Sequence, residues 1–202
     1  MSGSRPVPDD DPDLTKRAIA MTAEWVQQGQ RLDMQRLADA LGVSRVTVFR
    51  HAGGRDVILG ESLWILADRS MRAAERRFDA APCGATRSAG VLEQFNRLIA
   101  EAEGLRALLV KEPALALRVL TDPRGVVQPR IVTAIEDLLR RDQRDCGLQL
   151  PVDPQDLSFA LVRIGESFLY ADVLASRIPN VEVANRLQRA LIQSQHGPVT
   201  CS

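Results

Sequence analysis

The stretch LADALGVSRVTVFRHAGGRD, residues 37–56, decides the fold, because it contains two short helical patterns joined by a tight turn. The first pattern places its apolar residues on one face and includes the small Ala38, which lets two helices cross closely. Gly42 ends it, since glycine adopts a positive φ freely. Ser44 begins the second helix, where its hydroxyl can accept the amide of Thr47. The stretch therefore predicts a helix-turn-helix unit.

The second of these helices carries a local excess of positive charge. Three arginines, one aspartate and one histidine lie within residues 42–56, although the whole chain has 26 basic and 26 acidic residues. Between residues 14 and 60 seven basic residues stand against four acidic ones, a balance of +3. Because the formal net charge of the whole chain is zero, an acidic partner must be recognised by this local basic surface.

The second helix is predicted to turn Val48 inward and to present its remaining side chains to a partner. Arginines there can contact phosphates or guanine edges, and the methyl groups of Val46 and Thr47 suit thymine methyls. The alternative is a helical hairpin whose basic face is merely solvated. We predict that double-stranded DNA is bound by Ser44, Arg45, Val46, Thr47, Phe49, Arg50 and Arg55.

The longer segment LADALGVSRVTVFRHAGGRDVILGESL, residues 37–63, resembles the DNA-binding domain of TetR-type transcriptional repressors. The third helix of that family typically reads Ser-x-x-Thr-aliphatic-Tyr-x-His-Phe. The residues that fit it are Ser44, Thr47, Val48 and His51. The resemblance covers about residues 14 to 65.

The segment departs from the family pattern at several positions. Phe49 stands where Tyr is usual, Ala52 where Phe is usual, and Val46 where Gly or Ala is common. These departures bear on the operator sequence and leave the groove-binding role unchanged. Arg55 stands in place of the usual Lys, where a cation and a helix N-terminus can jointly meet a phosphate.

The composition predicts an all-α fold, with 45% hydrophobic, 26% charged and 4% aromatic residues and long Ala/Leu/Arg-rich runs. Residues 1–12 are expected to be a disordered tail. Residues 13–56 form the predicted helix-turn-helix domain, and residues 57–202 a larger helical domain. Further helices are predicted at 55–78, 87–102, 105–120 with a break at Pro113, 127–144, 156–177 and 181–195.

The resemblance implies that the larger domain binds a small effector among its central helices and forms a homodimer through its last two long helices. Apolar residues line two sides of the predicted helix around residues 157–172, so it should be buried on both. Arg163, Glu166 and Tyr170 share a third stripe at spacings of three and four. They could serve an effector pocket or a self-satisfied dimer seam, and the sequence leaves both open.

The stretch RIGESFLYAD, residues 163–172, also resembles a branch of TetR-type repressors that controls lactonase genes for the degradation of quorum-sensing lactones. That resemblance implies an amphiphilic lactone as the effector class. The residues predicted to contact the effector are Trp64, Phe95, Leu98, Leu109, Ile135, Arg163, Glu166 and Tyr170.

An enzyme is the main alternative class, because Gly60-Glu-Ser62 and Gly165-Glu-Ser167 begin like a nucleophile elbow. Both lack the final glycine and lie inside predicted helices, and no histidine is placed to activate either serine. We find no phosphate-binding glycine loop and no metal-ligand spacing. The sequence therefore predicts no catalytic residue, no metal and no cofactor. A helical protein-interaction adaptor is the other alternative.

The three cysteines, Cys83, Cys146 and Cys201, are widely spaced and are expected to be free thiols. The N-terminus has no apolar signal core, and no run of about 18 apolar residues could span a membrane. We therefore expect cytoplasmic localisation and no membrane partner.

Overall fold

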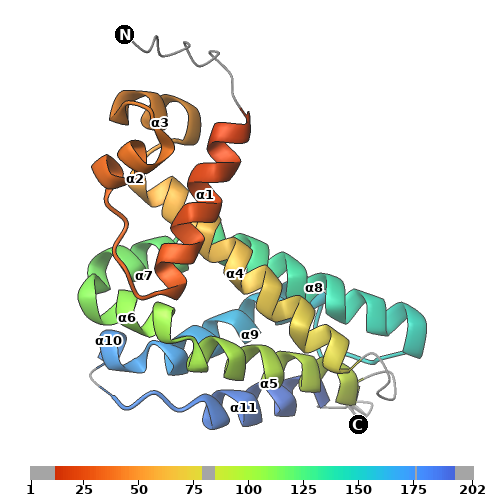
Figure 1. Ribbon diagram of the computed structural model, residues 1–202. Helices are drawn as coiled ribbons and strands as arrows, with labels where there is room; N and C mark the ends of the chain where they lie inside the picture. Colours follow the sequence, from red (N-terminus) through yellow and green to blue (C-terminus); the bar gives the residue numbers. More distant parts are fainter. Residues whose placement is uncertain (1–11, 79–84, 176, 194–202) are drawn as a thin grey trace, which may run out of the picture.

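The computed structural model describes residues 12–78, 85–175 and 177–193, and within them every regular element is a helix (Figure 1). The all-α prediction is confirmed. The predicted tail falls almost entirely outside the described residues. None of the described helices combines the length and the apolarity that a membrane crossing requires.

Three short helices form the N-terminal unit: α1 (Pro12–Gln27), α2 (Met34–Leu41) and α3 (Arg45–Ala52). The predicted turn chemistry is confirmed. The Asp33 carboxylate accepts the Arg36 amide at 2.8 Å, which caps α2. Gly42 has φ 71° after α2, and Ser44 Oγ accepts the Thr47 amide at 3.0 Å to start α3. Val48 is fully buried between the helices.

The long helix α4 (Arg55–Arg77) connects this unit to the rest of the molecule (Figure 1). It packs against α1 along one side and against helices of the larger domain along the other. Those helices are α5 (Ala85–Glu101), α6 (Glu103–Lys111), α7 (Pro113–Thr121), α8 (Val127–Cys146), α9 (Pro154–Leu169), α10 (Ala171–Ala175) and α11 (Val181–Gln193).

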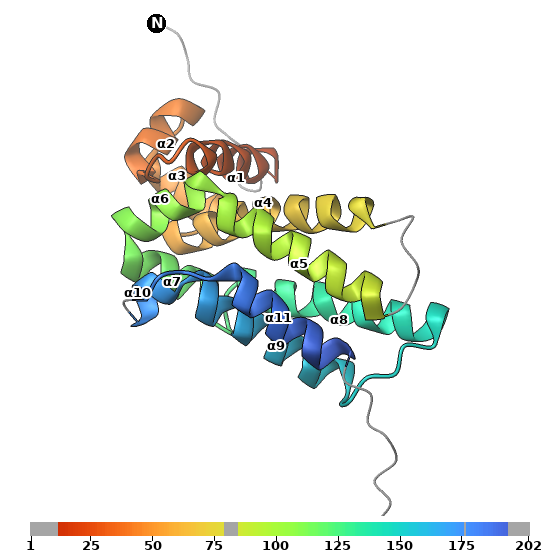
Figure 2. The ribbon, with the colours of Figure 1, turned by 90° about the horizontal axis from the view of Figure 1, so that it is seen from below.

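Helices α9 and α11 lie side by side in both views, with α11 against α5 and α9 against α8 (Figures 1 and 2). The predicted break at Pro113 is confirmed, since this residue starts α7 where its missing N–H costs nothing. The single helix predicted over 156–177 is wrong. It ends at Leu169, and Tyr170, at φ −108° and ψ 22°, separates it from α10. The hydrophobic periodicity of the sequence cannot reveal this break, because the break is one residue long and the Tyr170 ring stays buried.

One expectation about the cysteines is also wrong. Cys146, at the end of α8, is disulfide-bonded rather than a free thiol. Cys83 and Cys201 lie outside the described residues.

The two parts of the molecule meet where the start of α6 packs against the end of α1. A Cβ atom added to Gly104 would lie 2.1 Å from the carbonyl oxygen of Val26 and 2.9 Å from the Cα of Gln27. Only glycine permits this backbone approach. Nearby, Lys111 Nζ donates to the Gly29 carbonyl and Arg31 donates to the Lys111 carbonyl, each at 2.7 Å.

We predict that Gly104→Ala lowers the free energy of unfolding by about 1–3 kcal/mol, because the added methyl group must displace backbone rather than a flexible side chain. Thermal and urea unfolding measure the loss. Gly60→Ala is the matched control, since its Cβ would meet Val126 and Val119 at 3.4 and 3.6 Å, ordinary contact distances. Equal stability of the two variants would contradict the prediction.

Candidate functional sites

Helix α3 presents a surface that no part of the described chain covers. Val46 is 75% exposed and Phe49 is 64% exposed, whereas the neighbouring Val48 has no exposure. Arg45 and Arg50 are also exposed on this helix. Large apolar groups left in water beside arginines are a surface suited to an acidic partner with apolar edges, such as the methyl-lined major groove of DNA.

The exposed helix is held firmly from behind. Thr15 Oγ1, on α1, donates to the His51 carbonyl at 3.0 Å near the end of α3. At the start of α3, the hydroxyls of Ser44 and Thr47 are 2.8 Å apart in a hydrogen bond. The first of these bonds ties the end of α3 to α1, and the second caps the start of α3 itself.

The structure places Arg55 differently from the other predicted DNA contacts. Its Nε donates to the Leu32 carbonyl at 3.0 Å, and its Nη2 lies 2.7 Å from both carboxylate oxygens of Glu112. Glu112 also pairs with Arg31 at 3.3 Å. The guanidinium assigned to a phosphate by the sequence is therefore bound to a carboxylate at the domain junction. A phosphate contact by Arg55 would require it to leave that partner.

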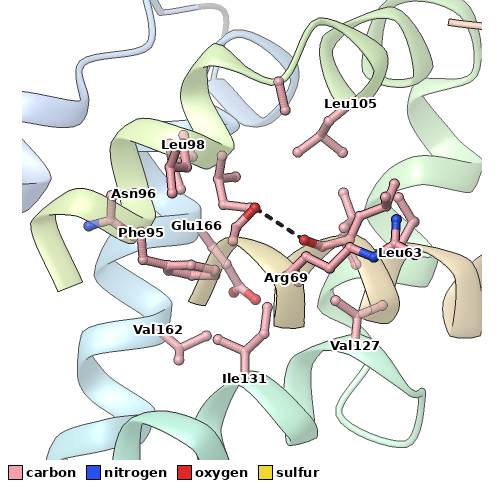
Figure 3. Close-up of a pocket in the computed structure, with 18 of the residues that line it drawn as sticks. Leu63, Arg69, Phe95, Asn96, Leu98, Leu105, Val127, Ile131, Val162 and Glu166 are labelled. Carbon is pink, nitrogen blue, oxygen red and sulfur yellow. Dashed lines mark hydrogen bonds between the residues drawn. The ribbon is translucent and has the colours of Figure 1, made fainter. Parts of the chain in front are cut away.

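A partly open cavity of about 410 Å³ lies between α1, α4, α5, α6, α7, α8, α9 and α11 (Figure 3). Its wall is mostly aliphatic, from Leu63 and Leu66 on α4 to Ile131 on α8. Val26 and Gln27 of α1 and Gly104 of α6 belong to the same wall. A bound molecule would therefore touch the DNA-binding unit directly.

The structure brings together five of the eight predicted effector contacts. Those that line the cavity are Phe95, Leu98, Ile135, Glu166 and Tyr170. The other three lie elsewhere. The Arg130 guanidinium covers the Trp64 ring, with its Cζ atom 5.8 Å from the ring centroid, and Leu109 is buried in the core between the two domains. Arg163 is half exposed outside the wall. An apolar helix face gives no sign of which of its residues meet a void.

Glu166 is the buried carboxylate of the cavity wall. Burial raises its pKa above the ordinary value, while the Arg163 ion pair and a hydrogen bond from Gln128 act in the opposite direction. Burial and the nearby Glu166 charge also raise the pKa of Tyr170, which stays neutral. The carboxylate of this ion pair therefore lies in the cavity wall and its cation on the outer surface.

Sequence reasoning missed two polar residues of the wall, Asn96 on α5 and Gln188 on α11. Asn96 Nδ2 donates to Gln188 Oε1 at 2.6 Å and to Asn185 Oδ1 at 2.8 Å. Asn185 and Gln188 share one buried helix face with Ala184. Amides at core positions of an amphipathic helix were the available signal, because buried polar groups need partners.

The enzyme alternative finds no support in the described residues. Ser62 Oγ is bound to the carbonyls of Ile58 and Ile19, and Ser167 Oγ to that of Arg163. Both serines lie within continuous helices rather than at strand-to-helix turns. No cluster of three or more potential metal ligands occurs in the part of the chain that the structure describes.

A helix-turn-helix unit joined through a long helix to an all-helical domain defines a helix-turn-helix transcription regulator. The family model described as "Tetracyclin repressor-like, C-terminal domain" matches residues 83–193. The chain belongs to the TetR family.

A solved structure that is 30% identical to the chain agrees with this assignment. The transcriptional repressor QsdR of R. erythropolis, from the TetR family, is similar over 93% of this chain and 100% of its own, with 30% identity and a TM-score of 0.82. PfmR, a TetR family transcriptional regulator of Thermus thermophilus, is similar over 93% of this chain and 100% of its own, with 20% identity and a TM-score of 0.43. No curated protein matches the chain.

We predict that Glu112→Gln lowers the free energy of unfolding by about 1 kcal/mol or more, because Arg55 and Arg31 lose a shared, largely buried carboxylate. Urea unfolding measures the change. Asp68→Asn is the control, since the Arg72 ion pair that it removes is exposed and should contribute well under 1 kcal/mol. Loss of equal size in both variants would show that the junction pair is an ordinary surface contact.

Proposed function

We propose that the protein is a cytoplasmic, one-component transcriptional repressor that binds a palindromic operator as a homodimer and is released by a small amphiphilic effector. The single observation that carries the DNA-binding role is the uncovered outer surface of α3, where Arg45 and Arg50 flank Val46 and Phe49. Arginines there would contact phosphates or guanine edges, and the apolar groups would meet thymine methyls. Ser44 and Thr47 complete the contact surface at the start of the helix.

The homodimer is supported by an exposed apolar face on α9 and α11. Leu187 of α11 is 44% exposed, and α9 and α11 pack side by side. Ile164 and Phe168 of α9 and Val183 of α11 are partly exposed. Two copies joined on this face by a two-fold axis would form a four-helix interface. They would carry two α3 helices, which must lie about 34 to 36 Å apart to enter successive major grooves.

Effector release is supported by the position of the cavity. Its wall includes α1, α4 and α6, so an occupant contacts both sides of the domain junction. An effector that fits better when α4 is swung would favour a state in which the two α3 helices no longer match the groove spacing. A lactone is the effector class that the likeness of residues 163–172 to regulators of lactone degradation supports. The apolar wall suits the hydrocarbon part of such a molecule.

We predict that Arg45→Ala and Arg50→Ala each lower operator affinity roughly tenfold or more, and that each lost phosphate contact reduces the salt slope by about 1. Fluorescence anisotropy with DNA from upstream of the protein's own gene, in excess non-specific competitor, measures both. Arg77→Ala is the control, because Arg77 lies in the last turn of α4, at the end farthest from α3. This variant should bind the operator with wild-type affinity. Unchanged affinity in all three variants, or no specific binding by the wild type, would favour the adaptor alternative.

We predict that Leu187→Glu converts the homodimer to a monomer, because a charge buried in an apolar interface has no partner. Sedimentation velocity measures the mass. Val110→Glu is the matched control, since Val110 is 74% exposed on α6, away from the α9 and α11 face. A wild-type monomer, or a Leu187→Glu variant that remains dimeric, would contradict the proposed interface.

A further inference from the structure

The polar end of the cavity has hydrogen-bonding directions that the backbone fixes. Gln188 Nε2 donates to the Leu161 carbonyl at 2.8 Å, and a backbone carbonyl can only accept. The Gln188 oxygen must therefore face Asn96, which offers its Nδ2 group to Gln188 and to Asn185. Both amide hydrogens of Asn96 are used in this way, and its Oδ1 is left as an acceptor.

Gly165 allows α9 to pack closely against this pair of amides. A Cβ atom at Gly165 would lie 3.3 Å from Gln188 Nε2 and 3.7 Å from Asn96 Oδ1. All three residues belong to the cavity wall, and Asn96 and Gln188 are each 2% exposed. The amide pair therefore closes this end of the cavity and is occupied by its own hydrogen bonds.

The next residue of α9 adds negative charge to the same region. Glu166 is 8% exposed and lines the cavity, and Figure 3 shows its side chain directed between Phe95 and Ile131. Arg163 pairs with this carboxylate from the outer surface. The charged residues of the wall are Arg69, Glu103 and Glu166. Arg69 and Glu103 are exposed, so the buried end of the cavity has an anion and no cation in its wall.

We propose that the effector is an uncharged or cationic amphiphile that donates an N–H or O–H hydrogen bond to Glu166, and that carboxylates of the same size are excluded. This inference rests on the proposed function of the cavity as the effector site and narrows its ligand class. A buried anion repels a second anion strongly where water is scarce. An acceptor left without a donor is also costly, so an ester lacking N–H loses affinity. A lactone would meet this requirement only if it also carried an N–H or O–H group.

Three probes with one hydrocarbon chain test the proposal: octanamide, methyl octanoate and octanoate, titrated into the full-length protein by calorimetry. We expect octanamide to bind about tenfold tighter than methyl octanoate. Octanoate should bind more weakly still. In the Glu166→Gln variant, the ratio of the Kd of octanoate to the Kd of methyl octanoate should fall at least about tenfold, because the opposing charge is gone. Glu101→Gln, an exposed position on α5 outside the wall, should keep the wild-type order.

The order of the three probes on the wild type tests the proposal even if Glu166→Gln does not fold, which its melting curve reveals. Octanoate binding as tightly as octanamide, methyl octanoate equal to octanamide, or no binding of any probe would overturn it. An octanoate deficit that persists in a folded Glu166→Gln variant would also overturn it. Specific operator binding, measured on the same preparations, separates the two proposals: intact DNA binding with the wrong probe order refutes the ligand class alone.

Discussion

The backbone contact between α1 and α6 at Gly104 is the constraint on which the rest of the structure depends. Because Gly104 has no Cβ, the start of α6 lies directly against the backbone at the end of α1. Neither helix can shift there without moving the other. The ion pairs of Glu112 and the hydrogen bonds of Lys111 then close the same junction with polar contacts. Because Val26 and Gly104 also belong to the cavity wall, the tightest contact between the domains is part of the candidate ligand site.

This arrangement couples packing to function without a separate relay. A molecule that expands the cavity must press on α4, α6 or the end of α1, and each of these helices is fixed to its neighbours by close packing. Close-packed interfaces respond by changing between discrete arrangements rather than by gradual deformation. The free energy of binding can then shift the populations of two arrangements only by the difference in affinity between them.

The sequence revealed the features that depend on local chemistry. Gly42 and Ser44 specify a turn and a cap through their own backbone and hydroxyl group, so the helix-turn-helix unit could be predicted to the residue. The cavity depends on which side chains remain uncovered after distant helices pack. The sequence could not distinguish Phe95, which lines the void, from Leu109, which fills the core. Arg55 shows the same limit, because its partner Glu112 lies 57 positions away.

The apolar character of the exposed α3 surface has a thermodynamic consequence. Val46 and Phe49 leave a hydrophobic area in water that contact with a groove would dehydrate. Dehydration of apolar area contributes a negative heat capacity change and does not depend on counterion release. Part of the binding free energy would therefore persist at ionic strengths that abolish purely phosphate-based attachment. The affinity of this surface for its site would accordingly vary with temperature more steeply than that of an arginine-only helix.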